Sequence, residues 1–268
     1  MVDMNLMRPA TMEEDHALLL EAMKYIDDIC AKENITYYAA YGTLLGAVRE
    51  HGFIAWDYDA DLWMKREDYN RFIEAAKNYP NPKFSLSAGG LPTLMRVHIN
   101  DTLVRTDKYS EYEAPRFHVD IFSLDFGYGN SKQDKRRMRT LTMMRKIVFR
   151  TMNKKWKYLK HVRRLKSLIR FAMKIPMQII PMSTWVSLYK RVLHNDSPDE
   201  KVLISTGGCY APKCEIYNAE LFAETTELPF EDMMIKCPAG YDELLTQIYG
   251  DYMTPYVRPV NANLWVKA

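Results

Sequence analysis

The spacing of apolar residues divides the first half of the chain into alternating helices and strands. Thr11 and Glu14 have the spacing of a capping box, and apolar residues then recur every three or four positions, which predicts a first helix ending near Lys32. A second helix is predicted over 66–78, before a proline-rich stop, and a short one over 44–50. Alternating or β-branched runs predict strands at 35–41, 59–64, 83–87, 93–100, 102–106 and 117–124. This alternation favours an α/β or α+β fold, a mixed sheet flanked by helices.

The pattern changes after residue 130 to a long, basic helical stretch. Apolar residues step by three or four positions over 141–172, which predicts one long helix or a helix pair. Residues 131–174 contain 17 of the 37 Lys and Arg residues and one of the 34 acids. The rest of the chain therefore has 20 basic and 33 acidic residues. Such a block requires a solvated face or an anionic partner. Beyond it, a hairpin is expected over 228–238 and a last helix over 241–249.

Composition and terminal pattern indicate a globular protein of the cytoplasm. The chain of 268 residues is 47% hydrophobic and 26% charged, as folded domains are. Residues 1–12 lack the basic and apolar regions of a signal peptide, and no uncharged apolar run reaches 18 residues. The four cysteines form no CxxC pair, which argues against a zinc knuckle or a disulfide framework.

Three carboxylates at alternate positions are the first sign of chemistry. Asp57, Asp59 and Asp61 fall at the start of a predicted strand, where side chains two apart point to the same face. Carboxylates this close to one another raise each other's pKa unless a cation lies between them. Oxygen ligands alone suit Mg²⁺ or Mn²⁺. The alternative is a solvated turn or a calcium-like surface site.

Several segments together resemble the signature of the LicD family, which includes bacterial phosphocholine transferases and relatives of the fukutin type. The matching segments are Gly42-Thr43-Leu44-Leu45-Gly46-Ala47-Val48-Arg49, Gly52-Phe53-Ile54, Trp56-Asp57-x-Asp59-x-Asp61, Arg66-Glu67-Asp68-Tyr69, residues 119–125 and residues 249–253. The resemblance implies a nucleotidyltransferase fold, a small mixed sheet in which Gly-Ser/Thr precedes an Asp-x-Asp pair. Many members have aspartate where this chain has Tyr58, a mild departure because that position alternates away from Asp59 and Asp61.

The resemblance also assigns roles to acidic residues. Asp59 and Asp61 are expected to hold metal ions, and Asp120, on a later strand, is expected to be the third carboxylate. These three are the candidate catalytic and metal-binding residues, with two Mg²⁺ or Mn²⁺ ions as cofactors. Asp57 matches the family's first aspartate and is expected to contribute to cofactor binding.

The remaining candidates are expected to bind phosphate. Gly42 would let the backbone approach a phosphate closely, and Thr43 would donate its hydroxyl. Arg49 and Arg66 are candidate phosphate clamps, with structural salt bridges at helix ends as the alternative for both.

The function implied by the resemblance is transfer of phosphocholine from CDP-choline to a sugar hydroxyl of a lipid-linked, teichoic acid-like surface glycan, with release of CMP. Three alternatives stay open: another CDP-alcohol donor such as CDP-ribitol, a nucleotidyltransferase that releases pyrophosphate, and a non-catalytic membrane-surface scaffold. Recognition of choline would need aromatic faces. The candidates near the acidic motif are Tyr37, Tyr38, Tyr41, Trp56, Tyr58 and Trp63.

We predict three parts of the chain: a catalytic core at 1–130, a basic helical insertion at 131–200, and a C-terminal part at 201–268 that completes the catalytic domain. Residues 131–195 are expected to lie against the anionic inner face of the cell membrane, near the lipid-linked oligosaccharide acceptor. An ordinary solvated helical hairpin is the alternative. The stretch contains no recognised nucleic-acid motif, so no nucleic-acid partner is expected.

Overall fold

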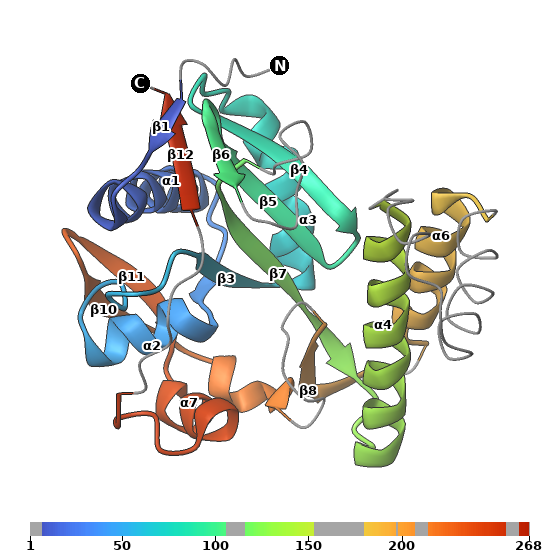
Figure 1. Cartoon of the computed structure of the whole chain (residues 1–268). Helices are drawn as coiled ribbons and strands as arrows, with labels where there is room; N and C mark the ends of the chain where they lie inside the picture. Colours follow the sequence, from blue (N-terminus) through green and yellow to red (C-terminus); the bar gives the residue numbers. More distant parts are fainter. Residues whose placement is uncertain are drawn as a thin grey trace, which may run out of the picture.

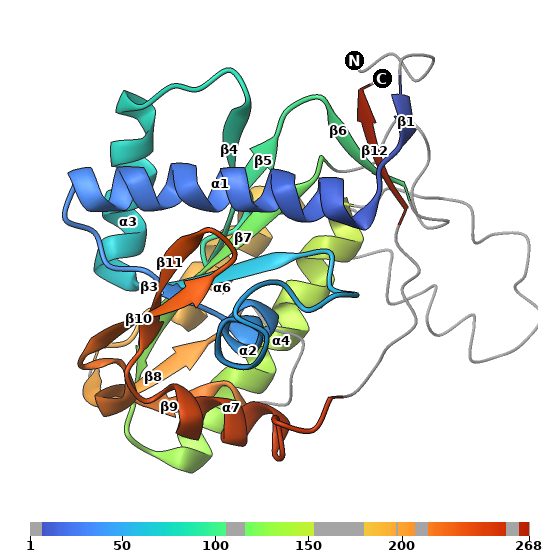
Figure 2. The same cartoon turned by 90° about the vertical axis from the view of Figure 1, so that its left-hand side faces the viewer.

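A mixed β-sheet lies at the centre of the molecule, and helices pack on it from both sides (Figures 1 and 2). The computed structural model describes residues 7–105, 116–152, 180–196, 198–206, 214–255 and 263–267. The α/β class expected from the sequence is confirmed. The strands of the central sheet are β2 (Tyr38–Ala39), β3 (Ala60–Lys65), β4 (Phe84–Leu91), β5 (Leu94–Ile99), β7 (His118–Gly127), β8 (Asp199–Ser205) and β9 (Ile216–Asn218).

The sheet is built around the long strand β7. The path runs β2-β3-β7-β5-β4, in which β3 and β7 are parallel and the other pairs are antiparallel. The first half of β7 pairs with β5 and its last residues pair with β8, which in turn pairs with β9. The helices are α1 (Met12–Lys32), α2 (Tyr41–Arg49), α3 (Arg66–Ala75), α4 (Ser131–Met152), α6 (Met182–Leu193) and α7 (Tyr241–Tyr249), with short 3₁₀ turns η2 (Ala76–Asn78) and η5 (Ala219–Phe222).

Two smaller sheets complete the described fold. Strands β1 (Met7–Pro9), β12 (Asn263–Lys267) and β6 (Thr102–Arg105) form one sheet, so that segments from the two ends of the chain lie side by side (Figure 1). The hairpin of β10 (Thr225–Phe230) and β11 (Met233–Pro238) forms the other and lies beside β2.

The two faces of the central sheet differ in character. Val119 and Ile121 of β7 are fully buried on the face that α1 and α3 cover. On the opposite face, Trp63 is buried beneath Tyr41 of α2 and Tyr217, with ring centroids 4.8 Å and 5.6 Å from its own. Asp61 lies two positions before Trp63 on β3, and its side chain points to the same second face because strand residues alternate. Asp61 therefore lies where the aromatic packing ends.

Most of the predicted elements are present, with shifted ends. The first helix, its capping box, the hairpin and the last helix are confirmed. The strand expected at 35–41 is limited to Tyr38–Ala39, because α2 already begins at Tyr41, which has a φ of 44°. Gly42 and Thr43 therefore lie in the first turn of a helix rather than in a turn before it.

The described part of the basic stretch is helical and packs against the sheet. Helices α4 and α6 lie against each other and against β4, with Met138, Leu141 and Val148 fully buried. The rest of the predicted helix pair, 153–179, lies outside the described residues. None of the helices in the part of the chain described here has the length and apolar character that crossing a membrane requires.

Candidate active site

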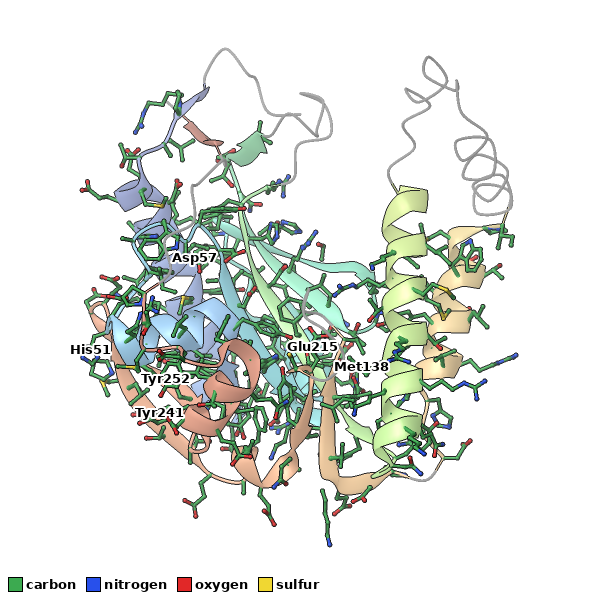
Figure 3. All side chains as sticks on the ribbon, turned by 60° about the horizontal axis from the view of Figure 1, so that its bottom comes forward. His51, Asp57, Met138, Glu215, Tyr241 and Tyr252 are labelled. Atoms are coloured by element: carbon green, nitrogen blue, oxygen red, sulfur yellow. The ribbon has the colours of Figure 1, made fainter. Side chains whose placement is uncertain are left out.

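The loop between α2 and β3 brings Asp57 against the start of α2 (Figure 3). A Cβ on Gly42 would lie 2.4 Å from Oδ2 of Asp57, so only glycine leaves room for this carboxylate. The loop is held from both ends of the chain. His16 of α1 donates from Nε2 to the Asp57 carbonyl oxygen at 2.7 Å, and the Phe53 amide donates to Oε1 of Glu231 at 2.9 Å. The position of Asp57 is thus fixed by three separate segments.

Thr43 connects the start of α2 to the start of β3. The amide of Asp61 donates to the Thr43 hydroxyl oxygen at 2.8 Å, and the Ala40 amide donates to the Asp61 carbonyl oxygen at 2.9 Å. Amides in the first turn of a helix have no acceptor within the helix, and such ends suit phosphate. Thr43 therefore has a positioning role toward Asp61, and the phosphate role of Gly42 and Thr43 stays a prediction.

Asp57, Asp59 and Asp120 form a group of crowded negative charges. Asp57 and Asp59 lie close enough for the charge of Asp57 to act on the Asp59 carboxylate. Loss of solvation, the charge of Asp57 and then the charge of Asp120 raise the pKa of Asp59 well above its ordinary value. Loss of solvation also raises the pKa of Asp57. The acids are therefore close enough to oppose one another's ionisation.

Asp120 is level with Asp61 on the neighbouring parallel strand, and an arginine and a histidine lie beside one of its oxygens. Nε of Arg96 on β5 donates to Oδ1 of Asp120 at 2.9 Å. Nε2 of His118 lies 3.3 Å from the same oxygen, while its Nδ1 donates to the carbonyl oxygen of Arg116 at 2.7 Å. Among the described residues both contacts involve Oδ1, which leaves the second oxygen, Oδ2, for another partner.

The two candidate phosphate clamps do not join this group. Arg49, at the last turn of α2, donates to Oε1 of Glu50 and to the carbonyl oxygen of Tyr252 at 2.7 and 2.9 Å. The bond to Tyr252 ties α2 to the segment after α7.

Arg66 lies at the opposite end of β3 from Asp59. It donates from Nε and Nη2 to both oxygens of Asp125 at 2.7 and 2.8 Å, and from Nη1 to the Pro92 carbonyl oxygen. Ser123 accepts a further bond from Nη2. The charge and hydrogen bonds of Asp125 raise the pKa of Arg66 despite burial, which alone would lower it. Arg66 thus makes the structural salt bridge that was its alternative, joining β3, β7 and the loop before β5, and its phosphate role stays a prediction.

The acidic side chains are of the type that binds a divalent cation, although they do not converge on one point as the ligands of a metal ion do. No three His, Cys, Asp or Glu side chains in the described residues already converge as ligands. After loss of solvation, the charges of Asp57 and Asp120 raise the pKa of Asp59, and a cation between these acids would relieve that repulsion. Oxygen donors from Asp59, Asp61 and Asp120 are those that Mg²⁺ or Mn²⁺ prefers.

The structure separates the aromatic candidates into two groups. Those packed in the core are Tyr37, Tyr38, Tyr41 and Trp63, none more than 3% exposed. Tyr58 is 38% exposed, and burial together with the charges of Asp59 and Asp57 raises its pKa. Trp56 is half-buried in the same loop. Only Trp56 and Tyr58 among these six remain accessible to a ligand.

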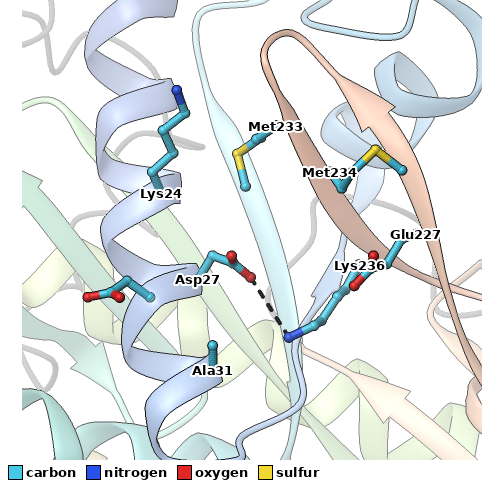
Figure 4. A pocket seen from close by; sticks show the side chains of 8 residues that line it. Lys24, Asp27, Ala31, Glu227, Met233, Met234 and Lys236 are labelled. Carbon is cyan, nitrogen blue, oxygen red and sulfur yellow. Dashed lines mark ion pairs between the residues drawn. The ribbon is translucent and has the colours of Figure 1, made fainter.

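A cavity of about 460 Å³ lies elsewhere, between α1 and the β10–β11 hairpin (Figure 4). Its charged side chains pair with residues around it, as Lys24 does with Asp232 at 2.6 Å and Lys236 with Asp27 at 3.8 Å. None of the candidate site residues lines it, so we do not assign the site to this cavity.

Arg96 and His118 are the site residues that sequence reasoning missed as partners of Asp120. The signal was present in part, because Arg96 and His98 alternate with apolar residues in one predicted strand, as His118 and Asp120 do in another. Alternation predicts a polar face on each strand. It does not give the pairing of β5 with β7, which brings Arg96 level with Asp120.

The fold and this group define an α/β protein with acidic side chains gathered where a parallel strand pair begins. Residues 34–172 match the family model described as LicD/FKTN/FKRP, nucleotidyltransferase domain. The chain therefore belongs to the LicD family, and the prediction of a phosphotransferase enzyme is confirmed at the level of reaction class.

Individual relatives agree with this membership. The chain is 27% identical to the lipopolysaccharide cholinephosphotransferase LicD of Haemophilus influenzae, over 92% of this chain and 93% of that protein. Uncharacterized proteins of Rickettsia typhi and Rickettsia prowazekii are 43% and 44% identical over 20% and 19% of this chain, and over 18% and 19% of their own lengths.

Proposed function

We propose that this enzyme transfers phosphocholine from CDP-choline to a sugar hydroxyl of a lipid-linked surface glycan and releases CMP. The observation that carries the proposal is the mutual crowding of Asp57, Asp59 and Asp120 beside a helix start that contains Gly42 and Thr43. The likeness over almost the full length to a protein named as a lipopolysaccharide cholinephosphotransferase supports the choice of headgroup.

The proposed chemistry is an in-line displacement at phosphorus. Asp59, Asp61 and Asp120 would hold Mg²⁺ or Mn²⁺, which when bound neutralises charge on the phosphate oxygens. Asp120 accepts the proton of the acceptor hydroxyl at Oδ2, since Oδ1 accepts the hydrogen bond from Arg96. The acceptor oxygen forms the new bond to phosphorus, and the bond from phosphorus to CMP breaks with its electron pair leaving on CMP.

The headgroup would meet the two accessible aromatic residues. A quaternary ammonium is attracted to an aromatic face by about 0.5–2 kcal/mol. Tyr58 and Trp56 lie in the loop that carries Asp57, so a choline bound there would sit beside the reacting phosphate. A polyol headgroup would gain little from these rings.

We also propose that α4 holds the enzyme at an anionic membrane surface. Its exposed cations, which we call the α4 basic face, are Lys132, Lys135, Arg136, Arg139 and Lys146. Met143 on the same helix is 57% exposed. Arg137 and Arg145 do not belong to this face, because they are buried and donate to the carbonyl oxygens of Phe126 and Thr206. A lipid-linked acceptor would be met at such a surface.

The experiment is to incubate the purified chain with Mg²⁺ or Mn²⁺ and CDP-choline, CDP-ethanolamine or CDP-ribitol in turn, and to measure CMP and pyrophosphate. The proposal predicts CMP, formed fastest from CDP-choline. A parallel incubation contains CTP and choline in place of the CDP-alcohol, and pyrophosphate formed there would instead establish a nucleotidyltransferase. CMP formed fastest from CDP-ribitol would overturn the choice of choline.

A variant pair separates the enzyme from a scaffold. Asp59→Asn should lower turnover by about a hundredfold or more while the protein stays folded, because the size of the residue is kept and its charge is lost. Asp28→Asn, an exposed acid on α1, should retain parental turnover. Equal turnover in both variants would contradict the assignment of Asp59.

A further inference from the structure

Polar side chains continue across the sheet from Asp120 in an ordered row. Asp61 on β3, Asp120 on β7, Arg96 on β5 and Ser87 on β4 are register partners on successive strands. The next row of partners comprises His118, His98 and Ser85. Because strand side chains alternate, both rows point to the same face as the acids.

The opposite face of the same strands is apolar and buried. Val97 and Val119, each adjacent to these polar residues in sequence, are fully buried against the α1 and α3 side. Arg96 and His118 are only partly exposed, with 26% and 18% of their side-chain surface accessible. They are therefore not the freely solvated side chains of an ordinary outer sheet face.

Arg96 has hydrogen-bonding capacity beyond its bond to Asp120. A guanidinium has five N–H donors, and among the described residues the acceptor found for Arg96 is Oδ1 of Asp120, bonded to Nε. The terminal nitrogens can thus serve a ligand next to the carboxylate. Planar paired donors of this kind match the oxygens of a phosphate.

The second row supplies further polar groups. Nε2 of His98 lies 2.6 Å from the Ser87 hydroxyl, while its Nδ1 is buried with no hydrogen-bond partner among the described residues. An orphaned buried nitrogen is costly, and a bound group would satisfy it. Nη1 of Arg116 donates to the Ser85 hydroxyl and to Oδ1 of Asn100 at 3.1 and 2.8 Å, which places a second guanidinium beside this row.

The electrostatics of these residues favour an anion. Burial, followed by the proximity of His118, Arg96 and Arg116, lowers the pKa of His98 to about 4. Among the described residues, Arg96 contacts the acid Asp120, whereas Arg116 contacts the neutral Asn100 and Ser85, so an anionic ligand would add a favourable charge beside it.

We propose that this surface, the β5 face (Arg96, His98, Arg116, Ser85 and Ser87), is a phosphate subsite next to the acids, in which Arg96 binds both Asp120 and the phosphate. The inference rests on the proposed function. The phosphate is either the diphosphate of the nucleotide donor or a phosphate carried by the acceptor, since both present the same oxygens.

The test measures binding without turnover, by titration calorimetry of the full chain with CDP and, separately, with glucose 6-phosphate as a probe of an acceptor phosphate. Arg96→Met should weaken one of the two by about tenfold or more, because a charge-assisted hydrogen bond is lost. Weaker CDP binding assigns the subsite to the donor, and weaker glucose 6-phosphate binding assigns it to the acceptor.

Arg96→Lys distinguishes binding from support of Asp120. Lysine keeps a positive charge for Asp120 but lacks the planar fork, so thermal stability should return toward that of the parent while phosphate affinity should not. Arg71→Met, which changes an exposed arginine on α3, is the matched control and should bind both probes normally.

Three results would overturn the subsite: parental affinity in Arg96→Met, full affinity restored by Arg96→Lys, or no binding of either probe to the parent chain. None of these depends on catalysis. Failure of the proposed function would show itself differently, as turnover that persists in Asp59→Asn.

Discussion

At the scale of single residues, the position of the Asp57 carboxylate depends on the absence of a side chain at Gly42. Two glycines of α2 are crowded, but by different neighbours. The missing Cβ of Gly42 faces the Asp57 carboxylate, whereas that of Gly46 would lie 2.3 Å from the backbone carbonyl oxygen of Gly52. A side-chain end can rotate away at little cost, and a backbone group cannot. A substitution at Gly42 should therefore affect the reaction, whereas one at Gly46 should affect the stability of the fold.

Gly42→Ala should preserve the fold and impair the reaction. Alanine favours a helix by about 0.5–1 kcal/mol over glycine, which offsets the cost of moving the Asp57 carboxylate. We expect kcat/KM to fall by about tenfold with the melting temperature within a few degrees of the parent. Gly46→Ala should instead lower the melting temperature clearly. Parental kcat/KM in Gly42→Ala would show that the position of Asp57 does not matter.

Asp15 gives a pH-dependent prediction away from the site. It is buried, one of its oxygens has no hydrogen-bond partner among the described residues, and burial followed by the charge of Glu14 raises its pKa to about 6. The ordinary value is 3.8. The folded state thus holds this proton more tightly than the unfolded chain, and stability contributed by the protonated form is lost as pH rises through 4 to 6.

Asp15→Asn should remove this loss, because asparagine is never ionised. We expect urea unfolding at pH 7.5 to give a free energy about 1–2 kcal/mol higher than that of the parent, and nearly equal values at pH 4. A variant that is no more stable than the parent at pH 7.5 would contradict the raised pKa.

At the scale of elements, the sequence predicted where most helices and strands lie but not how strands pair. Alternation in 93–100 and 117–124 identified a polar side for each strand. Only the pairing of β5 with β7 places Arg96 against Asp120, and pairing depends on contacts between distant segments. Arg66 shows that closeness in sequence does not give closeness in the fold. It follows the acidic motif closely in sequence, yet the length of β3 carries it to the far end of the strand.

The α4 helix shows what a charge count can and cannot establish. The excess of basic residues is real, but burial of Arg137 and Arg145 divides it into structural cations and an exposed face. Which of them pack could not be read from composition, because long basic side chains pack their stems as readily as they extend into water.

Changing all five cations of the α4 basic face to glutamine should weaken binding to anionic liposomes by more than about a hundredfold, since each contributes about 1 kcal/mol. Sedimentation with phosphatidylglycerol vesicles is the measurement, and turnover with a soluble sugar acceptor should persist. The matched control changes five exposed cations elsewhere: Lys24, Lys32, Arg71, Lys77 and Lys83. Equal sedimentation of the two variants would rule out the α4 basic face.

At the scale of the whole molecule, distant parts of the chain contribute to one site. The loop with Asp57 rests on α1 through His16 and on the C-terminal hairpin through Glu231. The acids themselves come from that loop, from β3 and from β7. The motif at 57–61 and the family resemblance identified the acids. The supports of the loop could not be identified, because they lie 41 and 178 residues away in the sequence.

The central claim is that these acids share a divalent cation, and Mn²⁺ binding followed by electron paramagnetic resonance tests it most directly. We predict saturable binding to the parent chain that weakens by about tenfold or more in Asp59→Asn and in Asp120→Asn, with Asp28→Asn unchanged. Parental Mn²⁺ affinity in both site variants would contradict the account.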